Sequence, residues 1–248
     1  MTDLTDAITT IAATPRLLVA LDFDGVLAPI VEVPSQARPL PRTADAVRAL
    51  SELPATTVAL VSGRGLADLA AVSGLTAPVQ LIGSHGGEFE GADGIALDDA
   101  ARARLDDLAD GLRALVSGEP GVTLEDKPAG VAVHVRNAER GVAARVLDAV
   151  RAGPASRPGV SATPGKEVLD LAVLEVSKGL ALDQLRERIG ATAVFFAGDD
   201  VTDETAFERL RAGDIGVKVG EGPTAAAYRV ADPQAVAELL EALLAARS

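Results

Sequence analysis

The sequence contains no cysteine and no tryptophan, and only two of its 248 residues are histidines. Without cysteine the chain can form no disulfide bond and can offer no thiolate to a metal. With so few histidines a zinc site is not expected, so any metal should be a hard cation held by oxygen atoms. The cofactor that this composition favours is Mg²⁺.

Long apolar runs and an excess of basic residues are also absent. No stretch approaches the roughly 20 apolar residues of a membrane span, and the first residues lack the basic start and apolar run of a signal peptide. The net charge of −13 argues against binding to nucleic acids or anionic membranes. We therefore expect a cytoplasmic protein that acts on a small molecule, as a monomer or at most a weak oligomer.

Apolar runs bounded by turn residues alternate with helical patterns at both ends of the chain, which indicates βαβ units around a parallel sheet. The expected strands lie at 16–22, 56–64, 79–86, 193–200 and 214–220, and the expected helices at 41–53, 66–72, 178–189, 203–210 and 233–246.

The middle of the chain has a different pattern. A helix is expected at 98–116, a hairpin at 122–136, a second helix at 138–151 and two more strands within 159–173. This order predicts an α/β core domain of residues 1–90 and 171–248, interrupted by an inserted α+β domain of residues 91–170. The two crossings should lie near 88–94 and 164–170, where glycines could act as hinges.

Two aspartates follow the first predicted strand, in LDFDG. Side chains two apart in an extended segment point the same way, so Asp22 and Asp24 should emerge together at the carboxyl end of the strand, where open α/β sheets bind ligands. Gly25 then lets the backbone turn sharply. Taken alone, this segment is more simply interpreted as a solvated acidic turn.

Three further segments place polar groups at strand ends or at a helix start. They carry Ser62, Lys178, and the acidic run Asp199, Asp200 and Asp203. Each alone is explained by helix capping or by a surface charge. Together they suit phosphoryl transfer, which needs positioning and charge neutralisation.

In this interpretation Asp22 attacks phosphorus and Asp24 moves the protons, while Mg²⁺ lies between Asp22 and Asp199. Ser62 and Lys178 bind the phosphate oxygens.

DFDGVLAP, VSGR, SKG and GDDVTDE resemble, in order, the four motifs of the haloacid dehalogenase superfamily. The resemblance implies a Rossmannoid core with a parallel sheet and an inserted α+β cap of the C2B type. It implies that Asp22 is the nucleophile and Asp24 the acid/base. Asp24 would also lend its backbone carbonyl to a magnesium ion held by Asp199 and Asp200, with Asp203 in support.

The wider set DFDGVLAPIV, SGR, SHG, GDDVTDE and VKVGEGPTAAAYRV is similar to trehalose-6-phosphate phosphatases. In that family the cap hairpin grips the sugar, which implies a substrate-binding set of Arg64, His85, Glu125, Lys127, Arg136 and Asp170. His134 is left open, because a structural histidine is equally consistent with its position. On residues alone, the charges of this hairpin are more simply a solvated face.

One segment departs from the family. Where the family carries E-x-R-P, this chain has Asp170, Leu171, Ala172 and Val173. The departure leaves open a phosphatase for another sugar phosphate, such as a sucrose, mannosylglycerate or hexose phosphate. A non-catalytic phosphosugar-binding regulator and a phosphomutase are the remaining alternatives.

Overall fold

The computed structural model describes residues 4–91, 97, 99–174 and 176–248. The chain divides into two compact units, with one boundary after residue 91 and the other before residue 177. Among the described residues, no helix is both long enough and apolar enough to span a bilayer.

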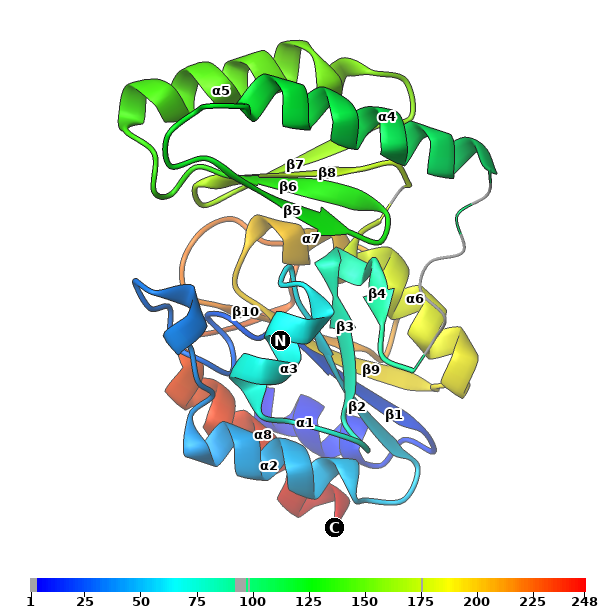
Figure 1. Cartoon of the computed structure of the whole chain (residues 1–248). Helices are drawn as coiled ribbons and strands as arrows, with labels where there is room; N and C mark the ends of the chain where they lie inside the picture. Colours follow the sequence, from blue (N-terminus) through cyan, green and yellow to red (C-terminus); the bar gives the residue numbers. More distant parts are fainter. Residues whose placement is uncertain (1–3, 92–96, 98, 175) are drawn as a thin grey trace. The chain divides into compact units, whose positions relative to one another are not determined.

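Seven strands form the sheet of the first unit within the described part of the chain, in the order β11-β10-β9-β1-β2-β3-β4 (Figure 1). Neighbouring strands run parallel, except that β4 is antiparallel to β3. Their bounds are β1 (Leu17–Leu21), β2 (Thr56–Val61), β3 (Gln80–Gly83), β4 (Glu88–Phe89), β9 (Ala193–Gly198), β10 (Ile215–Val219) and β11 (Tyr228–Val230).

Helices cover both faces of this sheet. Successive side chains of a strand point to opposite faces, so a central strand with helices on both sides is buried along its whole length, as β1 is. Its odd-numbered residues share a core with α1 (Leu4–Ala12), α2 (Pro41–Ser51), α3 (Leu66–Ser73) and α8 (Pro233–Arg247). Its even-numbered residues share a core with α6 (Lys178–Ile189) and α7 (Val201–Phe207). Short 3₁₀ turns lie at η1 (Pro34–Gln36) and η2 (Ser84–Gly86).

The second unit is an antiparallel sheet with the order β5-β6-β8-β7. Its strands are β5 (Thr123–Lys127), β6 (Gly130–His134), β7 (Ser161–Gly165) and β8 (Val168–Ala172). Helices α4 (Asp99–Val116) and α5 (Arg140–Ala152) lie on one face of this sheet, with η3 (Pro154–Ser156) after α5 (Figure 1). The apolar side chains of the strands turn toward these helices.

The opposite face of the small sheet carries polar side chains. The register pairs Glu125 of β5 with Ala132 of β6, and Ala132 with Asp170 of β8, so these three residues share one face. Lys127 is two residues beyond Glu125 and lies on the same face. The four-stranded unit therefore has an apolar face against α4 and α5 and a polar face on the other side.

The architecture confirms the expected α/β class, with a mostly parallel sheet and a separate α+β unit. The second boundary lies later than residue 171, because β8 is hydrogen-bonded into the small sheet through Ala172. The crossing expected at 164–170 is wrong for the same reason, since these residues form the β7–β8 hairpin. Asp98 and residues 92–94 of the expected helix and first crossing lie outside the described residues.

Candidate active site

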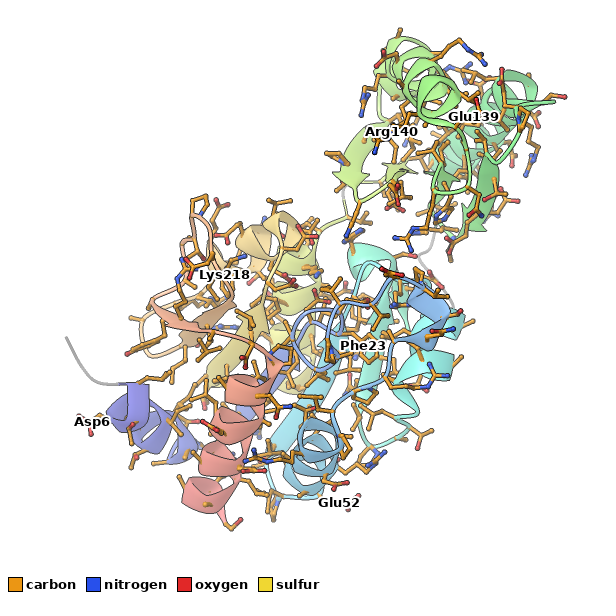
Figure 2. The ribbon with its side chains drawn as sticks, turned by 90° about the vertical axis from the view of Figure 1, so that its left-hand side faces the viewer. Asp6, Phe23, Glu52, Glu139, Arg140 and Lys218 are labelled. Carbon is orange, nitrogen blue, oxygen red and sulfur yellow. The ribbon has the colours of Figure 1, made fainter. Side chains whose placement is uncertain are left out.

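Three neighbouring parallel strands end at one edge of the large sheet and carry the predicted site residues there. Leu21, the last residue of β1, lies opposite Ala197 of β9 and Leu60 of β2. Asp22, Asp199 and Ser62 follow these strands, so the register brings them to the same edge. Figure 2 labels Phe23, which marks the segment after β1, and Lys218, which marks β10.

A buried lysine lies between two carboxylates at the centre of this edge. Lys178 Nζ is 2.8 Å from Asp22 Oδ2 and 2.8 Å from Asp203 Oδ1. The side chains of Lys178, Asp22 and Asp203 are 2%, 7% and 0% exposed. Lys178 reaches them from the first turn of α6, whose N-cap Ser177 accepts a hydrogen bond from the Leu180 amide at 3.1 Å.

Burial and neighbouring charges shift the protonation equilibria of this cluster. Burial raises the pKa of Asp22 well above its usual range, and Lys178 opposes that rise. Burial also acts to lower the pKa of Lys178, but the carboxylates of Asp203 and Asp22 outweigh it and raise that pKa. Lys178 therefore remains a cation, and it lowers the cost of ionising the buried Asp22 carboxyl.

Asp203 fixes the loop between β9 and α7. Its Oδ2 accepts the backbone amides of Asp199 and Asp200, each at 3.0 Å. Asp200 in turn caps the start of α7, so the two residues form a reciprocal capping box. From the neighbouring strand, the ammonium group of the buried Lys218 donates to the backbone carbonyl of Asp199. The position of Asp199 is thus set by contacts from two sides.

Three carboxylates converge closely enough to share a cation. One oxygen each from Asp22, Asp199 and Asp203 lies within 4.8 Å of the others. The side chain of Asp200, which is also expected among the metal ligands, caps the start of α7. Asp203, expected in support, lies beside the other two, and its oxygens also accept from Lys178 and from two backbone amides. The oxygen-only donor set suits a hard divalent cation.

Two glycines allow the acidic loops to approach each other. Gly25 has a φ of +77°, and a Cβ built on it would lie 2.1 Å from Asp199 Oδ2. A Cβ on Gly198 would lie 2.3 Å from Asp203 Cγ. Any larger residue at these positions would therefore displace a carboxylate of the cluster.

Asp24 and Arg64 form a two-pronged ion pair. Arg64 Nε is 2.6 Å from Asp24 Oδ2, and Nη2 is 2.7 Å from Oδ1. The guanidinium also donates to Asp68 at 2.7 Å and to the Pro34 carbonyl at 3.0 Å. Asp24, the predicted acid/base, and Arg64, a predicted substrate contact, therefore bind each other.

The turn after β2 is locked to the turn after β3. Ser62 is buried, and its hydroxyl accepts the Arg64 amide at 3.2 Å. The His85 amide donates to the Ser62 carbonyl at 2.9 Å, while the Ser84 amide donates to the Arg64 carbonyl at 2.7 Å. Gly63 lies so close to the His85 ring that a Cβ would meet Cε1 at 2.5 Å. The structure therefore brings His85 to the Ser62–Arg64 turn.

The other four predicted substrate contacts lie in the second unit. Glu125 and Lys127 stand on its polar face, where Lys127 pairs with Asp170 at 2.6 Å. His134 Nε2 lies 2.8 Å from Glu125 Oε2, and this hydrogen bond lowers the pKa of Glu125. Arg136 lies beyond the end of β6 and contacts Glu167 at 3.2 Å.

Comparisons with known proteins agree with these motifs. The trehalose-phosphate phosphatase of Mycobacterium ulcerans is 37% identical over 259 residues, which cover 96% of this chain and 65% of that relative. The protein of the same name from Mycolicibacterium paratuberculosis is 39% identical over 244 residues, which cover 91% of this chain and 61% of that relative. This chain thus spans less than two thirds of the length of these relatives.

Solved structures show the same fold. The C-terminal domain of C. albicans trehalose-6-phosphate phosphatase superposes with a TM-score of 0.76 at 23% identity, over 96% of each chain. A haloacid dehalogenase-like hydrolase from B. subtilis gives 0.61 at 15% identity, over 90% of this chain and 98% of that one. The chain therefore has a haloacid dehalogenase-like fold. Because the family model for trehalose-phosphatase matches residues 20–234, the chain belongs to the trehalose-phosphatase family.

Proposed function

We propose that this protein is a Mg²⁺-dependent phosphatase that hydrolyses trehalose 6-phosphate through an aspartyl-phosphate intermediate. The observation that carries the proposal is the buried Asp22–Lys178 pair at the carboxyl edge of the sheet, with Asp199 and Asp203 beside it. A hydrolase acting on an anionic ester needs a nucleophile among groups that neutralise phosphate charge, and this cluster offers both.

Asp22 is the nucleophile in this proposal. Its Oδ1 accepts the Phe23 amide at 2.6 Å and its Oδ2 lies against Lys178, so the carboxylate is held in one orientation. A fixed orientation favours in-line attack on phosphorus. Besides holding the Asp22 carboxylate, Lys178 neutralises the negative charge that develops on the phosphoryl oxygens.

Asp24 is the proton carrier. In the first half-reaction a bond forms between Asp22 and phosphorus, the bond from phosphorus to the sugar oxygen breaks, and that oxygen takes the proton of Asp24. In the second half-reaction water attacks phosphorus and gives a proton to Asp24, and the bond to Asp22 breaks. Ser62 donates a hydrogen bond to a phosphoryl oxygen in both steps.

The residues present fit a magnesium ion. Asp22 and Asp199 offer carboxylate oxygens, and the Asp24 carbonyl is the third protein ligand in the proposal. Asp203 has both oxygens committed to Lys178 and to the two backbone amides, so it supports the site. A bound cation supplies charge neutralisation at the phosphate and keeps the carboxylates ionised.

The polar face of the second unit is proposed to bind the disaccharide. Glu125, Lys127 and Asp170 share this face, and they offer both donors and acceptors for sugar hydroxyls. The family arginine that is missing from this chain corresponds to Ala172, which the register places on the same face. This specific difference favours, as the second candidate, a phosphatase for another sugar phosphate.

A substrate panel tests the proposal and its alternative. The purified protein with Mg²⁺ is assayed for phosphate release from trehalose 6-phosphate, sucrose 6-phosphate, mannosylglycerate phosphate and glucose 6-phosphate. We expect the highest kcat/KM for trehalose 6-phosphate. A higher value for another ester would reassign the substrate, and tight binding without phosphate release would indicate a regulator.

Replacing Gly25 by alanine should lower the phosphatase kcat/KM by about 10²-fold, because the new Cβ would push the Asp199 carboxylate away by an amount comparable to a bond length. Gly74 offers a matched control, since it also has a positive φ, of +60°, but no atom lies within 4 Å of the position that a Cβ would take. Gly74→Ala should cost some stability through backbone strain and leave kcat/KM unchanged. Equal activity losses in both variants would contradict this account of Gly25.

Metal binding should depend on pH through Asp199. Burial, with Asp203 next, raises the pKa of Asp199 to about 7, so the metal-free folded protein keeps a proton that the unfolded chain has lost. The contribution of the protonated Asp199 to folding stability is therefore present at low pH and is lost as pH rises through about 7. A cation competes with that proton, so Mg²⁺ should raise the melting temperature more at about pH 8 than at about pH 6.

Thermal unfolding with EDTA or Mg²⁺ at each pH measures this effect. Asp199→Asn should reduce the difference between the two pH values. A Mg²⁺ stabilisation that is the same at both pH values in the unmodified protein would show that Asp199 is not the titrating ligand.

Substitutions on the polar face of the small sheet should separate binding from chemistry. Lys127→Met should raise KM for trehalose 6-phosphate by about tenfold and leave kcat nearly unchanged. A sugar contact that is equally strong in the ground state and in the transition state affects only substrate binding. Hydrolysis of p-nitrophenyl phosphate, which has no sugar, should not change. The control is Asp126→Asn, since Asp126 lies on the opposite face and pairs with Arg113 at 3.1 Å. An unchanged KM for Lys127→Met would remove this face from the sugar site.

A further inference from the structure

Arg64 is held by more partners than a substrate contact needs. It donates hydrogen bonds to Asp24, Asp68 and the Pro34 carbonyl, and its guanidinium carbon lies 5.6 Å from the centre of the Phe23 ring. Its side chain is 10% exposed. Burial acts to lower the pKa of Arg64, but the hydrogen bonds and charges of Asp24 and Asp68 together outweigh it and raise that pKa, so Arg64 remains a cation.

The pairing with Asp24 fixes a direction as well as a distance. Two parallel hydrogen bonds at 2.6 and 2.7 Å hold both carboxyl oxygens in the plane of the guanidinium. The Asp24 side chain is 31% exposed, so without Arg64 it would turn among several rotamers. Asp68 and Pro34 come from α3 and η1, and they anchor the far side of the guanidinium.

We propose that Arg64 is a positioning residue that aims the Asp24 side chain, and that it does not act mainly as a contact to the phosphate or the sugar. The inference rests on the proposed function, in which Asp24 exchanges a proton with the leaving oxygen. Four of the five N–H groups of Arg64 are directed at protein acceptors, so a two-pronged grip on a substrate would require breaking at least one of these bonds. Arg64, held by this set of contacts, therefore affects catalysis through the Asp24 side chain that it orients.

Leaving-group dependence separates this role from a general structural one. The alkoxide of a sugar leaves poorly and needs the proton of Asp24, whereas p-nitrophenolate leaves well without it. The parameter kcat/KM reports the steps up to leaving-group departure. Arg64→Ala should therefore lower kcat/KM by about 10²-fold for trehalose 6-phosphate and by no more than about threefold for p-nitrophenyl phosphate.

A double-mutant cycle tests whether Arg64 acts through Asp24. Asp24→Asn alone should produce the same leaving-group contrast. Adding Arg64→Ala to it should change kcat/KM for trehalose 6-phosphate by no more than about threefold, because the orienting residue has nothing left to orient. Arg64→Lys should recover part of the activity, since an ammonium keeps the charge without the two-pronged geometry.

Two controls keep the outcome interpretable. Arg42 forms a similar two-pronged pair with Glu241, at 2.8 and 2.6 Å, on the exposed surface of α2 and α8. Arg42→Ala should leave both substrates unaffected. The inhibition constant of inorganic phosphate measures phosphate binding directly, and it should stay within about twofold in Arg64→Ala.

Three results would overturn the inference. They are equal losses on the two substrates, full additivity of Arg64→Ala with Asp24→Asn, and weaker inhibition by phosphate by about tenfold or more. Failure of the proposed substrate is recognised separately, because the unmodified protein would then hydrolyse another ester best. In that case the same comparison is made between p-nitrophenyl phosphate and the best sugar phosphate of the panel.

Discussion

Asp22→Asn should reduce phosphate release to background, a loss of about 10⁵-fold or more in kcat, because the amide has no charge to attack phosphorus. Asparagine has nearly the shape of aspartate, so the loss would come from chemistry alone. The measurement is turnover of trehalose 6-phosphate and of p-nitrophenyl phosphate, since both need the nucleophile.

The same substitution should leave folding stability within about 1 kcal/mol of the unmodified protein or raise it. Burial raises the pKa of Asp22, which means that its charge is costly in the folded state. Lys178 would keep Asp203 as its partner at 2.8 Å. Denaturant unfolding measures this free energy.

Asp203→Asn is the matched contrast to Asp22→Asn, because both carboxylates contact the same lysine. Asp203 accepts Lys178 with Oδ1 and two backbone amides with Oδ2, and an asparagine side chain has only one acceptor oxygen for these two sites. This variant should lose about 3 kcal/mol of stability. Turnover by Asp22→Asn, or equal stability of the two variants, would contradict the roles assigned to them.

Lys178→Met should have the second largest effect, on activity and stability together. The side chain is buried between Asp22 and Asp203, so its removal leaves two carboxylates without their cation. We expect a loss of about 3–5 kcal/mol in the free energy of unfolding. We also expect kcat to fall by about 10³-fold, because the charge that faces the phosphoryl oxygens is lost.

Arg186 provides the control for destabilisation. It is a buried cation on the same helix and pairs with Asp214, away from the acidic cluster. Arg186→Met should destabilise by a similar amount and keep kcat near that of the unmodified protein, measured well below its melting temperature. If kcat fell equally in both variants, the effect of Lys178 would be structural.

The sequence predicted this edge of the sheet well, because an apolar run and the polar residues that directly follow it can be recognised within a short stretch of sequence. The apolar run before Asp22 and the run before Asp199 both become central strands, and both acids follow within one residue of the strand end. The α6 helix spans Lys178–Ile189, as expected, because the Ser177 cap and the glycine at 190 mark its ends.

Other elements could not be predicted because their signals are weak or non-local. Helix α1 has three threonines among nine residues, which lowers its helix propensity, and it is stabilised by packing of Ile8 and Ile11. Strands β4 and β11 are two and three residues long and exist through their pairing with neighbours.

The details of the site depend on contacts across the chain. Asp24 and Arg64 are 40 residues apart, and no sequence pattern shows that they form an ion pair. Asp203 follows Asp199 by four residues and carries a capping signal, yet its contact with Lys178 becomes visible only in the folded chain. The departure at Asp170–Val173 was visible in the sequence, but only the register shows that Asp170 and Ala172 share a face with Glu125.

The most direct test of the account is a rapid acid quench of the enzyme with trehalose 6-phosphate that carries a radioactive phosphorus label. With enzyme in excess and Mg²⁺ present, we predict that label appears transiently on the peptide containing Asp22, while free trehalose forms no later than free phosphate. The protein-bound label should then pass into inorganic phosphate. Label on a different residue, or turnover of this ester with no label on the protein at any time, would contradict the central claim.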